Sequence, residues 1–204
     1  MAPETPSPKY HRGNVRADLI AMALQRLRSH GAATLTLTSL AQAIGVSPPA
    51  VYNHFRNREA LLAAVAAEGF RVLLAMLRAA VETAERPGDK LDGVRAQLYA
   101  VAVAHLRFAA DEPALYRLMF RDEIENRQAY PELIDLEDEA FRMIGLIHYP
   151  RIDRRKRVQD YPLAFLIWAT LHGIACLLSD RQVAFRNERE LETIARTAMD
   201  RLLP

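Results

Sequence analysis

Cysteine, glycine and tryptophan are scarce in this chain of 204 residues, which has one cysteine, eight glycines and one tryptophan. A single cysteine, Cys176, excludes an internal disulfide framework and is typical of a reducing compartment, so we expect a cytoplasmic protein. No apolar run reaches the ~18 residues of a membrane-spanning helix. The opening residues MAPETPSPKYHRGN contain no apolar segment of the signal-peptide kind. We therefore expect no membrane partner.

The motifs of common enzyme classes are also missing. There is no nucleophile elbow, no glycine-rich phosphate loop and no H-E-x-x-H pair. His172 and Cys176 are four residues apart, a spacing that fits a metal on one helix face, but no second pair accompanies them. We expect neither an enzyme nor a metal site.

Half of the residues are apolar and a quarter are charged, as in a soluble globular protein. The charge is unevenly distributed. Residues 1–60 hold seven basic and three acidic residues, a net charge of +4, whereas the other 20 basic and 22 acidic residues give −2. A basic first quarter favours contact with a polyanion. The basic run at residues 151–157 could be a second nucleic-acid site, but an exposed loop is the favoured interpretation.

Apolar residues recur with helical spacing along the chain, and no stretch shows the alternation of a strand. The first helix starts after Asn14 and stops at Gly31 in a left-handed conformation. A short helix follows, capped by Thr36 or Thr38 and stopped by Gly45. Further helices are expected over about residues 48–55, 58–84 (ended by Pro87-Gly88), 91–109, 113–120, 131–147, 162–178 and 190–203. The sequence therefore predicts an all-α fold.

The segment TSLAQAIGVSPPAVYNHF predicts two short helices joined by a tight turn. Gly45 permits the chain reversal and small Ala41 permits close approach of the helices. The apolar residues expected to pack together are Leu40, Ala41, Ile44, Val46, Val51 and Phe55. In a helix-turn-helix of this kind, the second helix lies in the major groove of DNA.

The segment from Tyr10 to Val65 resembles the N-terminal domain of the TetR family, and its run GVS-x-x-A-V-Y-x-HF-x-N-R-E-A-LL is close to that family's most specific motif. Two later segments, Glu112-Pro-Ala-Leu-Tyr-Arg-Leu-Met-Phe120 and Trp168-Ala-Thr-Leu-His172-Gly173, are similar to the branch with a WHG-type C-terminal domain. The resemblance implies three parts. Residues 1–12 would be a flexible basic arm, 13–60 the helix-turn-helix domain, and 61–204 a helical regulatory and dimerisation domain.

The resemblance also implies which residues contact double-stranded DNA. Thr36, Tyr52, His54 and Arg58 would bind phosphates, which fixes register without reading sequence. Base reading would fall to Thr38, Pro48, Pro49 and Asn53, with Ser47 capping the second helix and the arm residues Arg12 and Arg16 assisting. Position 48 departs from the family, which often has a basic or polar residue there. A proline offers an apolar contact but donates no hydrogen bond.

An unidentified small apolar or amphipathic effector is implied as well, with no other cofactor. Its pocket would be lined by Tyr99, His105, Tyr116, Phe120, Trp168 and His172, although such side chains can equally be ordinary core residues. A homodimer is expected through the last two helices. Its apolar faces would carry Leu163, Ile167, Thr170, Leu171, Ile174 and Leu178, with Leu191, Ile194, Ala198 and Leu202.

We therefore predict a sequence-specific transcriptional regulator, a repressor that a ligand releases from a palindromic operator. It would be associated with the nucleoid when bound to DNA. An activator or a co-repressor-dependent regulator remains an alternative, because operator position is not encoded in the protein. A helical scaffold without specific DNA binding is the other competing interpretation.

Overall fold

The computed structural model describes residues 14–84, 90–148, 153, 156 and 160–203, and all regular structure within them is helical, as predicted. The helices are α1 (Val15–His30), α2 (Leu37–Ile44), α3 (Pro48–Tyr52), α4 (Arg58–Thr83), α5 (Lys90–Asp111), α6 (Pro113–Phe120), α7 (Pro131–His148), α8 (Pro162–Ser179) and α9 (Glu188–Leu202), with the 3-10 turns η1 (Ala32–Thr34) and η2 (Arg127–Ala129). The predicted arm at 1–12, the Pro87-Gly88 stop and the arginines of the 151–157 loop lie outside the described residues.

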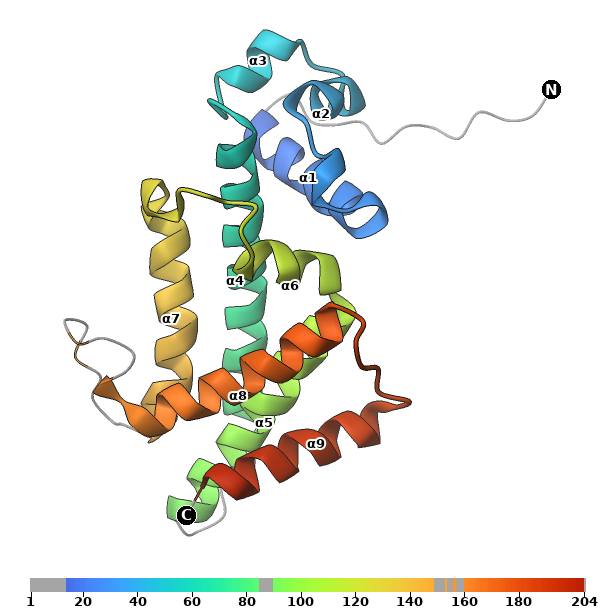
Figure 1. Ribbon diagram of the computed structural model, residues 1–204. Coiled ribbons are helices and arrows are strands. Elements are labelled where there is room, and N and C mark those ends of the chain that lie inside the picture. The colour runs from blue at the N-terminus through green and yellow to red at the C-terminus, as the bar shows by residue number, and fades with distance from the viewer. Residues whose placement is uncertain (1–13, 85–89, 149–152, 154–155, 157–159, 204) are drawn as a thin grey trace.

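The helices form two parts, a head (residues 14–57, with α1 to α3) and a body (residue 58 onward). Figure 1 shows the head at one end of the molecule and α8 and α9 toward the other. Within the head, α1 packs against α2, and α2 packs against α3. The predicted domain boundary after residue 60 falls in the first turn of α4, so one continuous helix joins the head to the body.

Local sequence determines where the helices of the head begin and end. Asn14, Thr36 and Asn57 each accept a hydrogen bond from the backbone N–H three residues on, at 3.2, 3.1 and 2.8 Å. These bonds satisfy N–H groups that the first turn leaves free. Gly45 ends α2 in the left-handed helical conformation. Gly31 also has positive φ, but its ψ of 170° lies outside the left-handed helical region that we predicted.

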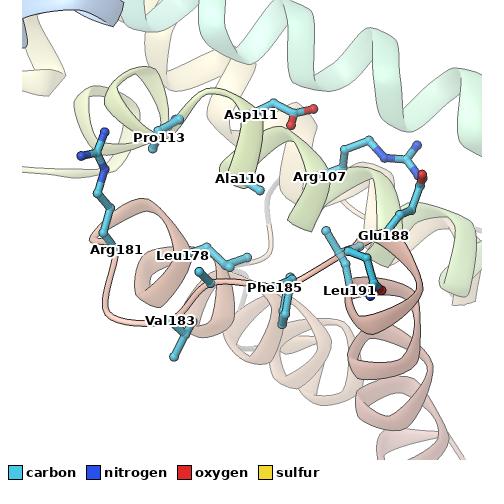
Figure 2. Close-up of a pocket in the computed structure, with 12 residues that line it drawn as sticks. Arg107, Ala110, Asp111, Pro113, Leu178, Arg181, Val183, Phe185, Glu188 and Leu191 are labelled. Atoms are coloured by element: carbon cyan, nitrogen blue, oxygen red, sulfur yellow. The ribbon is translucent and has the colours of Figure 1, made fainter.

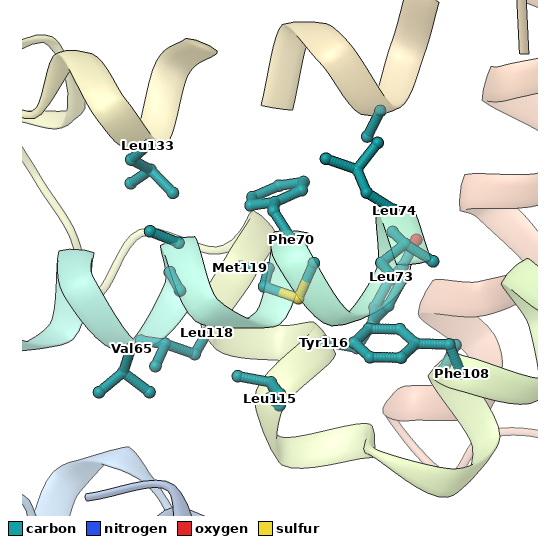
Figure 3. Packing of buried hydrophobic residues seen from close by; sticks show 14 of the residues in the cluster. Val65, Phe70, Leu73, Leu74, Phe108, Leu115, Tyr116, Leu118, Met119 and Leu133 are labelled. Atoms are coloured by element: carbon teal, nitrogen blue, oxygen red, sulfur yellow. The ribbon is translucent and has the colours of Figure 1, made fainter. Parts of the chain in front are cut away.

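The body is built around α4, which packs against α5, α6 and α7, while α5 packs against α8 and α9. Phe70 and Leu73 of α4 are buried among side chains of α6 (Figure 3). Gly69 allows α6 to come close, because a Cβ there would lie 2.6 Å from Met119 Sδ and 3.0 Å from Leu115 Cδ1. The position of α6 on α4 therefore depends on a missing side chain.

Two helices, α4 and α8, are long and apolar enough to cross a membrane by length and composition alone, with mean hydropathies of 1.9 and 1.7. We expected no apolar stretch long enough to span a membrane, and α4 and α8 depart from that expectation. Core helices of soluble proteins pass the same test, and 67% of the α4 stretch is buried inside the protein. Only 33% of the α8 stretch is buried, so α8 presents apolar side chains outward.

The outward face of α8 is only partly the face that we predicted, since Leu163, Thr170 and Ile174 are half-buried. Ile167 and Leu171 are fully buried in the chain's own core, and Leu191 of α9 is buried too. The exposed side chains of α8 include Leu166 and Leu177, which are 50% and 42% exposed. Because α8 is apolar on all sides, helical periodicity could not distinguish its inward face from its outward one.

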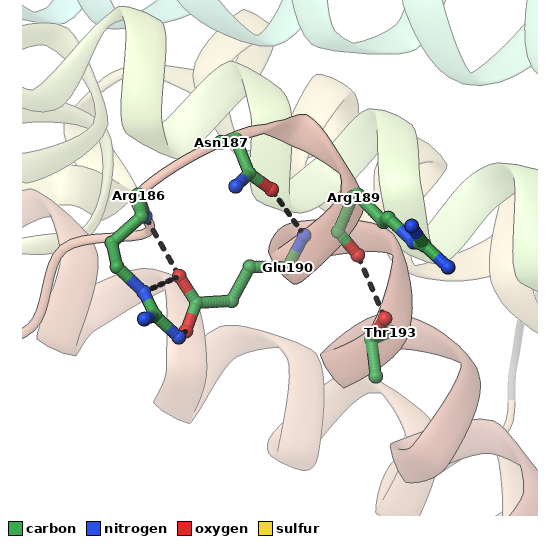
Figure 4. Close-up of polar contacts among 5 residues, drawn as sticks. All are labelled: Arg186, Asn187, Arg189, Glu190 and Thr193. Carbon is green, nitrogen blue, oxygen red and sulfur yellow. Dashed lines mark hydrogen bonds and ion pairs between the residues drawn. The ribbon is translucent and has the colours of Figure 1, made fainter.

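Helix α9 begins two residues before the predicted start (Figure 4). Asn187 caps it, because its Oδ1 accepts a hydrogen bond of 3.0 Å from the N–H of Glu190. The carboxylate of Glu190 in turn accepts a hydrogen bond of 2.7 Å from the backbone N–H of Arg186. A cap and a first-turn carboxylate therefore stabilise this helix start together.

Candidate nucleic-acid interface and ligand pocket

The turn between α2 and α3 has the geometry of a helix-turn-helix. At Gly45 the chain leaves α2, and the N–H of Val46 then donates back to the carbonyl of Ala41 at 3.0 Å. Ser47 precedes α3 and Pro48 occupies its first turn. Val51 is fully buried, so α3 is anchored to the head by its inner side. Its other side faces outward.

The predicted DNA-contact residues lie largely on that outer surface. Eight of them are exposed, and Tyr52 is 54% exposed despite its large ring. These eight are Thr36, Thr38, Ser47, Pro48, Pro49, Tyr52, Asn53 and His54. They come from the start of α2, from α3 and from the turn after it. A set of polar and small side chains on the outside of a short anchored helix is available to a large partner.

Helix α3 is shorter than predicted. It ends at Tyr52 rather than near Phe55, so Asn53 and His54 lie in the turn that follows. The N–H groups of His54 and Phe55 both donate to the carbonyl of Val51, each at 3.0 Å. This tightened turn directs Phe55 into the core, where it is 3% exposed.

Five of the six predicted effector residues form one cluster in the body, with His105 and Tyr116 buried and the other three half-buried. The Tyr116 hydroxyl lies 3.0 Å from Nε2 of His105 and 2.8 Å from Nδ1 of His172. The ring of Phe120 lies beside His172, with centroids 4.6 Å apart. Trp168 stacks on the imidazole ring of His172, with the ring centroids 5.1 Å apart. Helices α5, α6 and α8 thus bring together residues that are far apart in sequence.

The hydrogen bonds of this cluster continue to Cys176, whose Sγ lies 3.4 Å from Nε2 of His172. They can all run in one direction. His105 Nε2–H donates to the Tyr116 oxygen, the Tyr116 hydroxyl donates to His172, and His172 Nε2–H donates to the sulfur. With the bonds in this direction, Nδ1 of His105 carries no hydrogen. The atom without a partner among the described residues is then an acceptor and not an N–H group.

Burial keeps this network uncharged. It lowers the pKa of His105 to about 3, with a smaller contribution from His172, and it raises the pKa of Tyr116. Burial also lowers the pKa of His172, against the opposing effect of Glu137. The pKa of the Cys176 thiol is raised by burial. A protonated thiol is a weak nucleophile and an imidazole with a lowered pKa is a weak base, so these groups fit a polar part of the core.

The interior of this cluster is packed, and a pocket lies beside it. Trp168 lines a pocket of about 370 Å³ together with Phe141 and Ile134 of α7. The polar lining includes Arg127, whose Nη2 donates to Glu137 Oε2 at 2.7 Å. Apolar walls with a few polar groups are usual for small-molecule sites. We call this the α7–α8 pocket.

The structure does not bring Tyr99 to this pocket. Its hydroxyl donates to Asp200 of α9, and the guanidinium of Arg196 lies 4.7 Å from its ring centroid. Tyr99 lines a separate groove between α4, α5 and α9. A larger hollow of about 700 Å³ lies between the end of α5 and the loop from α8 to α9, where Arg107 pairs with Glu188 (Figure 2). Its polar side chains are largely surface residues.

Two family models match the chain in the order of its two parts. The model described as "Bacterial regulatory proteins, tetR family" matches residues 19–65, and the one described as "Tetracyclin repressor-like, C-terminal domain" matches residues 98–202. The chain belongs to the TetR family. This confirms the resemblance inferred from the helix-turn-helix motif, while assignment to the WHG branch stays a prediction.

Curated TetR-type relatives are distant. The chain is 25% identical over 159 residues to the HTH-type transcriptional repressor KstR2 of Mycolicibacterium smegmatis. The matched segment covers 78% of this chain and 64% of that protein. It is 25% identical over 123 residues to the HTH-type transcriptional regulator Rv1816 of Mycobacterium tuberculosis, covering 59% and 50%. The chain thus spans between half and two thirds of the length of these relatives.

Solved structures match over nearly the whole chain. A protein of unknown function from Rhodococcus sp. RHA1 is 30% identical, with a TM-score of 0.73 and coverage of 97% of this chain and 100% of that one. The fatty acid degradation regulator FadR from Bacillus halodurans is 15% identical, with a TM-score of 0.67 and coverage of 95% and 97%. The second likeness supports the fold alone.

In this TetR-family chain, Arg58 has a structural partner in the head. Its Nε donates to the carbonyl of Leu35 at 2.8 Å and its Nη2 to the carbonyl of Ala32 at 2.7 Å. Arg58 therefore ties the start of α4 to the connection between α1 and α2. Its phosphate contact stays a prediction, and only the remaining N–H groups of the guanidinium could serve it. Arg16, the other described arginine proposed for DNA, lies over the ring of Phe55 at 5.4 Å.

Sequence reasoning missed the polar lining of the α7–α8 pocket. Arg127 lies in η2, outside any predicted helix, and Glu137 lies on a helix rich in acidic residues. Neither has a motif or a periodic position that distinguishes it from a surface residue. Only the fold shows that they face each other beside Trp168.

Proposed function

We propose that this chain is a cytoplasmic transcriptional repressor that binds a palindromic operator as a homodimer and releases it when a small molecule binds the body. The observation that carries the proposal is the exposed outer surface of α3 on a head that matches the TetR DNA-binding domain. The printed names of KstR2 and Rv1816, a repressor and a regulator, support the same role.

The outward face of α8 supports the dimer. Leu166 and Leu177 are exposed there, and Ile194 of α9 is 38% exposed. An exposed apolar patch is a common protein interface. Gly173 is exposed, and a Cβ added to it would meet nothing within 4 Å in the protomer. The glycine is thus not needed for packing within the chain, which fits close approach of a second copy.

Binding to DNA can be tested by fluorescence anisotropy on DNA from upstream of the gene, with random DNA as competitor and a salt series. We expect a steep salt dependence and a preference of about 10³-fold or more. In the Asn53→Ala variant the preference should relax at one operator position, while Tyr52→Phe should weaken binding to all sequences. Equal affinity for both DNAs, or no binding at low salt, would contradict specific repression.

The dimer can be tested by sedimentation equilibrium. We expect Leu166→Asp to give a monomer, because a carboxylate buried in an apolar interface is strongly unfavourable. Val72→Asp is the matched control, since Val72 is also an exposed apolar residue, 42% exposed on α4. If both variants stay dimeric, the interface lies elsewhere.

A further inference from the structure

Three buried side-chain atoms have no hydrogen-bond partner within the part of the chain that the structure describes. They are Nδ1 of His105, Nη1 of Arg127 and the hydroxyl of Tyr130. Buried polar atoms in folded proteins nearly always have a partner, so each exception is informative. Two of the three lie close together in sequence, in the connection from α6 to α7.

Arg127 and Tyr130 each line a cavity, and the cavity at Arg127 is the larger, at about 370 Å³ against about 220 Å³. The α7–α8 pocket is lined by Arg127, by the apolar side chains of Ile134, Phe141 and Trp168, and by Gln128, Glu137 and Asp138. One nitrogen of Arg127, Nη2, is paired with Glu137, which balances its charge. The other, Nη1, is covered by protein and donates to nothing described. A hydrogen-bond donor without an acceptor among the described residues therefore lies just behind the wall of a pocket that is partly apolar.

We propose that the α7–α8 pocket is the effector site, and that the effector is an apolar molecule whose carbonyl or carboxylate oxygen accepts a hydrogen bond from Arg127. This deepens the proposed function and rests on it. The volume of about 370 Å³ lies within the usual range for small-molecule sites. Because Nη1 is covered, the oxygen reaches it only when the guanidinium turns toward the pocket. Effector binding thus moves Arg127.

The connection that carries Arg127 also touches the junction of head and body. The N–H of Asn126 donates to Oε1 of Glu59 at 2.8 Å. Three residues further on from Arg127, the ring of Tyr130 lies under the guanidinium of Arg56, 5.6 Å from it. Arg56 and Glu59 flank the residues where α4 begins. A displacement of Arg127 is therefore passed to both sides of the helix start that joins the head to the body.

Trp168 is the only tryptophan in the sequence, so its fluorescence reports directly on the pocket. Three probes of similar size would be titrated: cyclohexyl methyl ketone, cyclohexanecarboxylate and ethylcyclohexane, the last without an oxygen. We expect saturable fluorescence change with the ketone or the carboxylate, and binding of ethylcyclohexane weaker by about tenfold or more, as for loss of a charged hydrogen bond. Whether the ketone or the carboxylate binds more tightly distinguishes a neutral effector from an anionic one.

Variants of Arg127 make the test specific. Arg127→Met removes the donor, and Arg127→Lys keeps the ion pair with Glu137 but loses the forked geometry. Both should weaken binding of the oxygen-bearing probes about tenfold. Arg78→Met, which removes the ion pair between Arg78 of α4 and Glu139 of α7, should leave their binding unchanged. Equal affinity of the wild type and either folded Arg127 variant would overturn the proposal, as would no binding of either oxygen-bearing probe.

The link to the head has a separate readout. Glu59→Met removes the oxygen that accepts from Asn126. In this variant the probe should bind the α7–α8 pocket as in the wild type, but should change affinity for upstream DNA less than it does in the wild type. An unchanged probe effect in Glu59→Met would overturn the link. If the protein bound no such DNA at all, the proposed function would fail while the fluorescence titration still judged the pocket. If it bound DNA but no probe altered Trp168, the pocket proposal alone would fail.

Discussion

The indole ring of Trp168 lies parallel to the imidazole ring of His172, with the ring centroids 5.1 Å apart and an angle of 4° between the planes. His172 belongs to the buried network with Tyr116, and Trp168 lines the α7–α8 pocket. One face-to-face contact therefore connects the pocket with the polar part of the core. A change in the pocket should therefore be detectable in the buried network, and a change in the network should be detectable in the pocket.

The hydroxyl of Tyr116 should contribute more to stability than its ring packing suggests. Tyr116→Phe keeps the ring but leaves buried nitrogens of His105 and His172 without their partner. We expect the free energy of unfolding to fall by about 1–3 kcal/mol, measured by urea denaturation. Tyr52→Phe is the control and should cost nothing measurable, because Tyr52 is exposed. Equal stability of the two variants would argue against the network.

Stability should also depend on pH through His105. In the unfolded chain this histidine takes up a proton near its ordinary pKa of 6.5, whereas burial holds its pKa in the folded protein at about 3. Between these values the unfolded state binds more protons. The contribution of His105 to the free energy of unfolding is therefore complete above pH 6.5. It is lost as the pH falls toward 3, by up to about 1.4 kcal/mol per pH unit.

This pH dependence can be checked by denaturant unfolding between about pH 7 and pH 4, a range that covers most of the window that the two pKa values define. The variant His105→Gln keeps a side chain that can hydrogen-bond to Tyr116 but has no titrating group. Its free energy of unfolding should fall less steeply on acidification than that of the wild type. Identical slopes for the two proteins would show that other groups cause the acid sensitivity.

Gly69 should be essential for the position of α6. In Gly69→Ala the new methyl group would meet side-chain atoms of Met119 and Leu115 at 3.0 Å or less. Overpacking of this kind costs about 1–3 kcal/mol, and the gain in helix propensity offsets about 1 kcal/mol of it. Gly93→Ala is the control, since nothing lies within 4 Å of its new Cβ. We expect a lower melting temperature for the first variant and a higher one for the second.

Arg58 should affect both stability and DNA binding. Arg58→Ala removes hydrogen bonds to the carbonyls of Ala32 and Leu35, so we expect a loss of about 1–3 kcal/mol in the free energy of unfolding. If Arg58 also contacts a phosphate, the salt dependence of DNA binding should fall by about one unit for all sequences. His54→Ala is the comparison, because its exposed side chain should alter DNA affinity with no change in stability. A normal salt slope in Arg58→Ala would limit this residue to its structural role.

Most of the fold could be predicted because its signals are local. Asn14, Thr36 and Asn57 bond to residues three positions away, and Gly45 needs only its own positive φ. Such features are readable from a few neighbouring residues. The exposed surface of α3 was likewise predictable, since burial of Val51 follows from the apolar pattern of the motif.

The body was less predictable because its decisive contacts join distant residues. Tyr116 and His172 are 56 residues apart, and Arg28 and Glu112, which pair between α1 and the start of α6, are 84 apart. No periodicity encodes such pairs. The outward face of α8 was hard to predict for a different reason, because apolar residues surround the whole helix. The pair of Arg127 and Glu137 could not be predicted for a third reason, because neither residue has a motif or a periodic position that distinguishes it from a surface residue.

Arg58 opens α4 and at the same time holds two carbonyls of the connection that leads into α2. The three small helices of the head must therefore travel with the first turn of α4 as one block. In the repressor that we propose, operator choice and effector choice would therefore be separate properties. Substitutions on the outer surface of α3 would direct the protein to new operators and leave the proposed effector site intact, and substitutions in the pocket would change the ligand without altering the DNA sites that are bound. Such independence would allow duplicated copies to diverge in one property at a time.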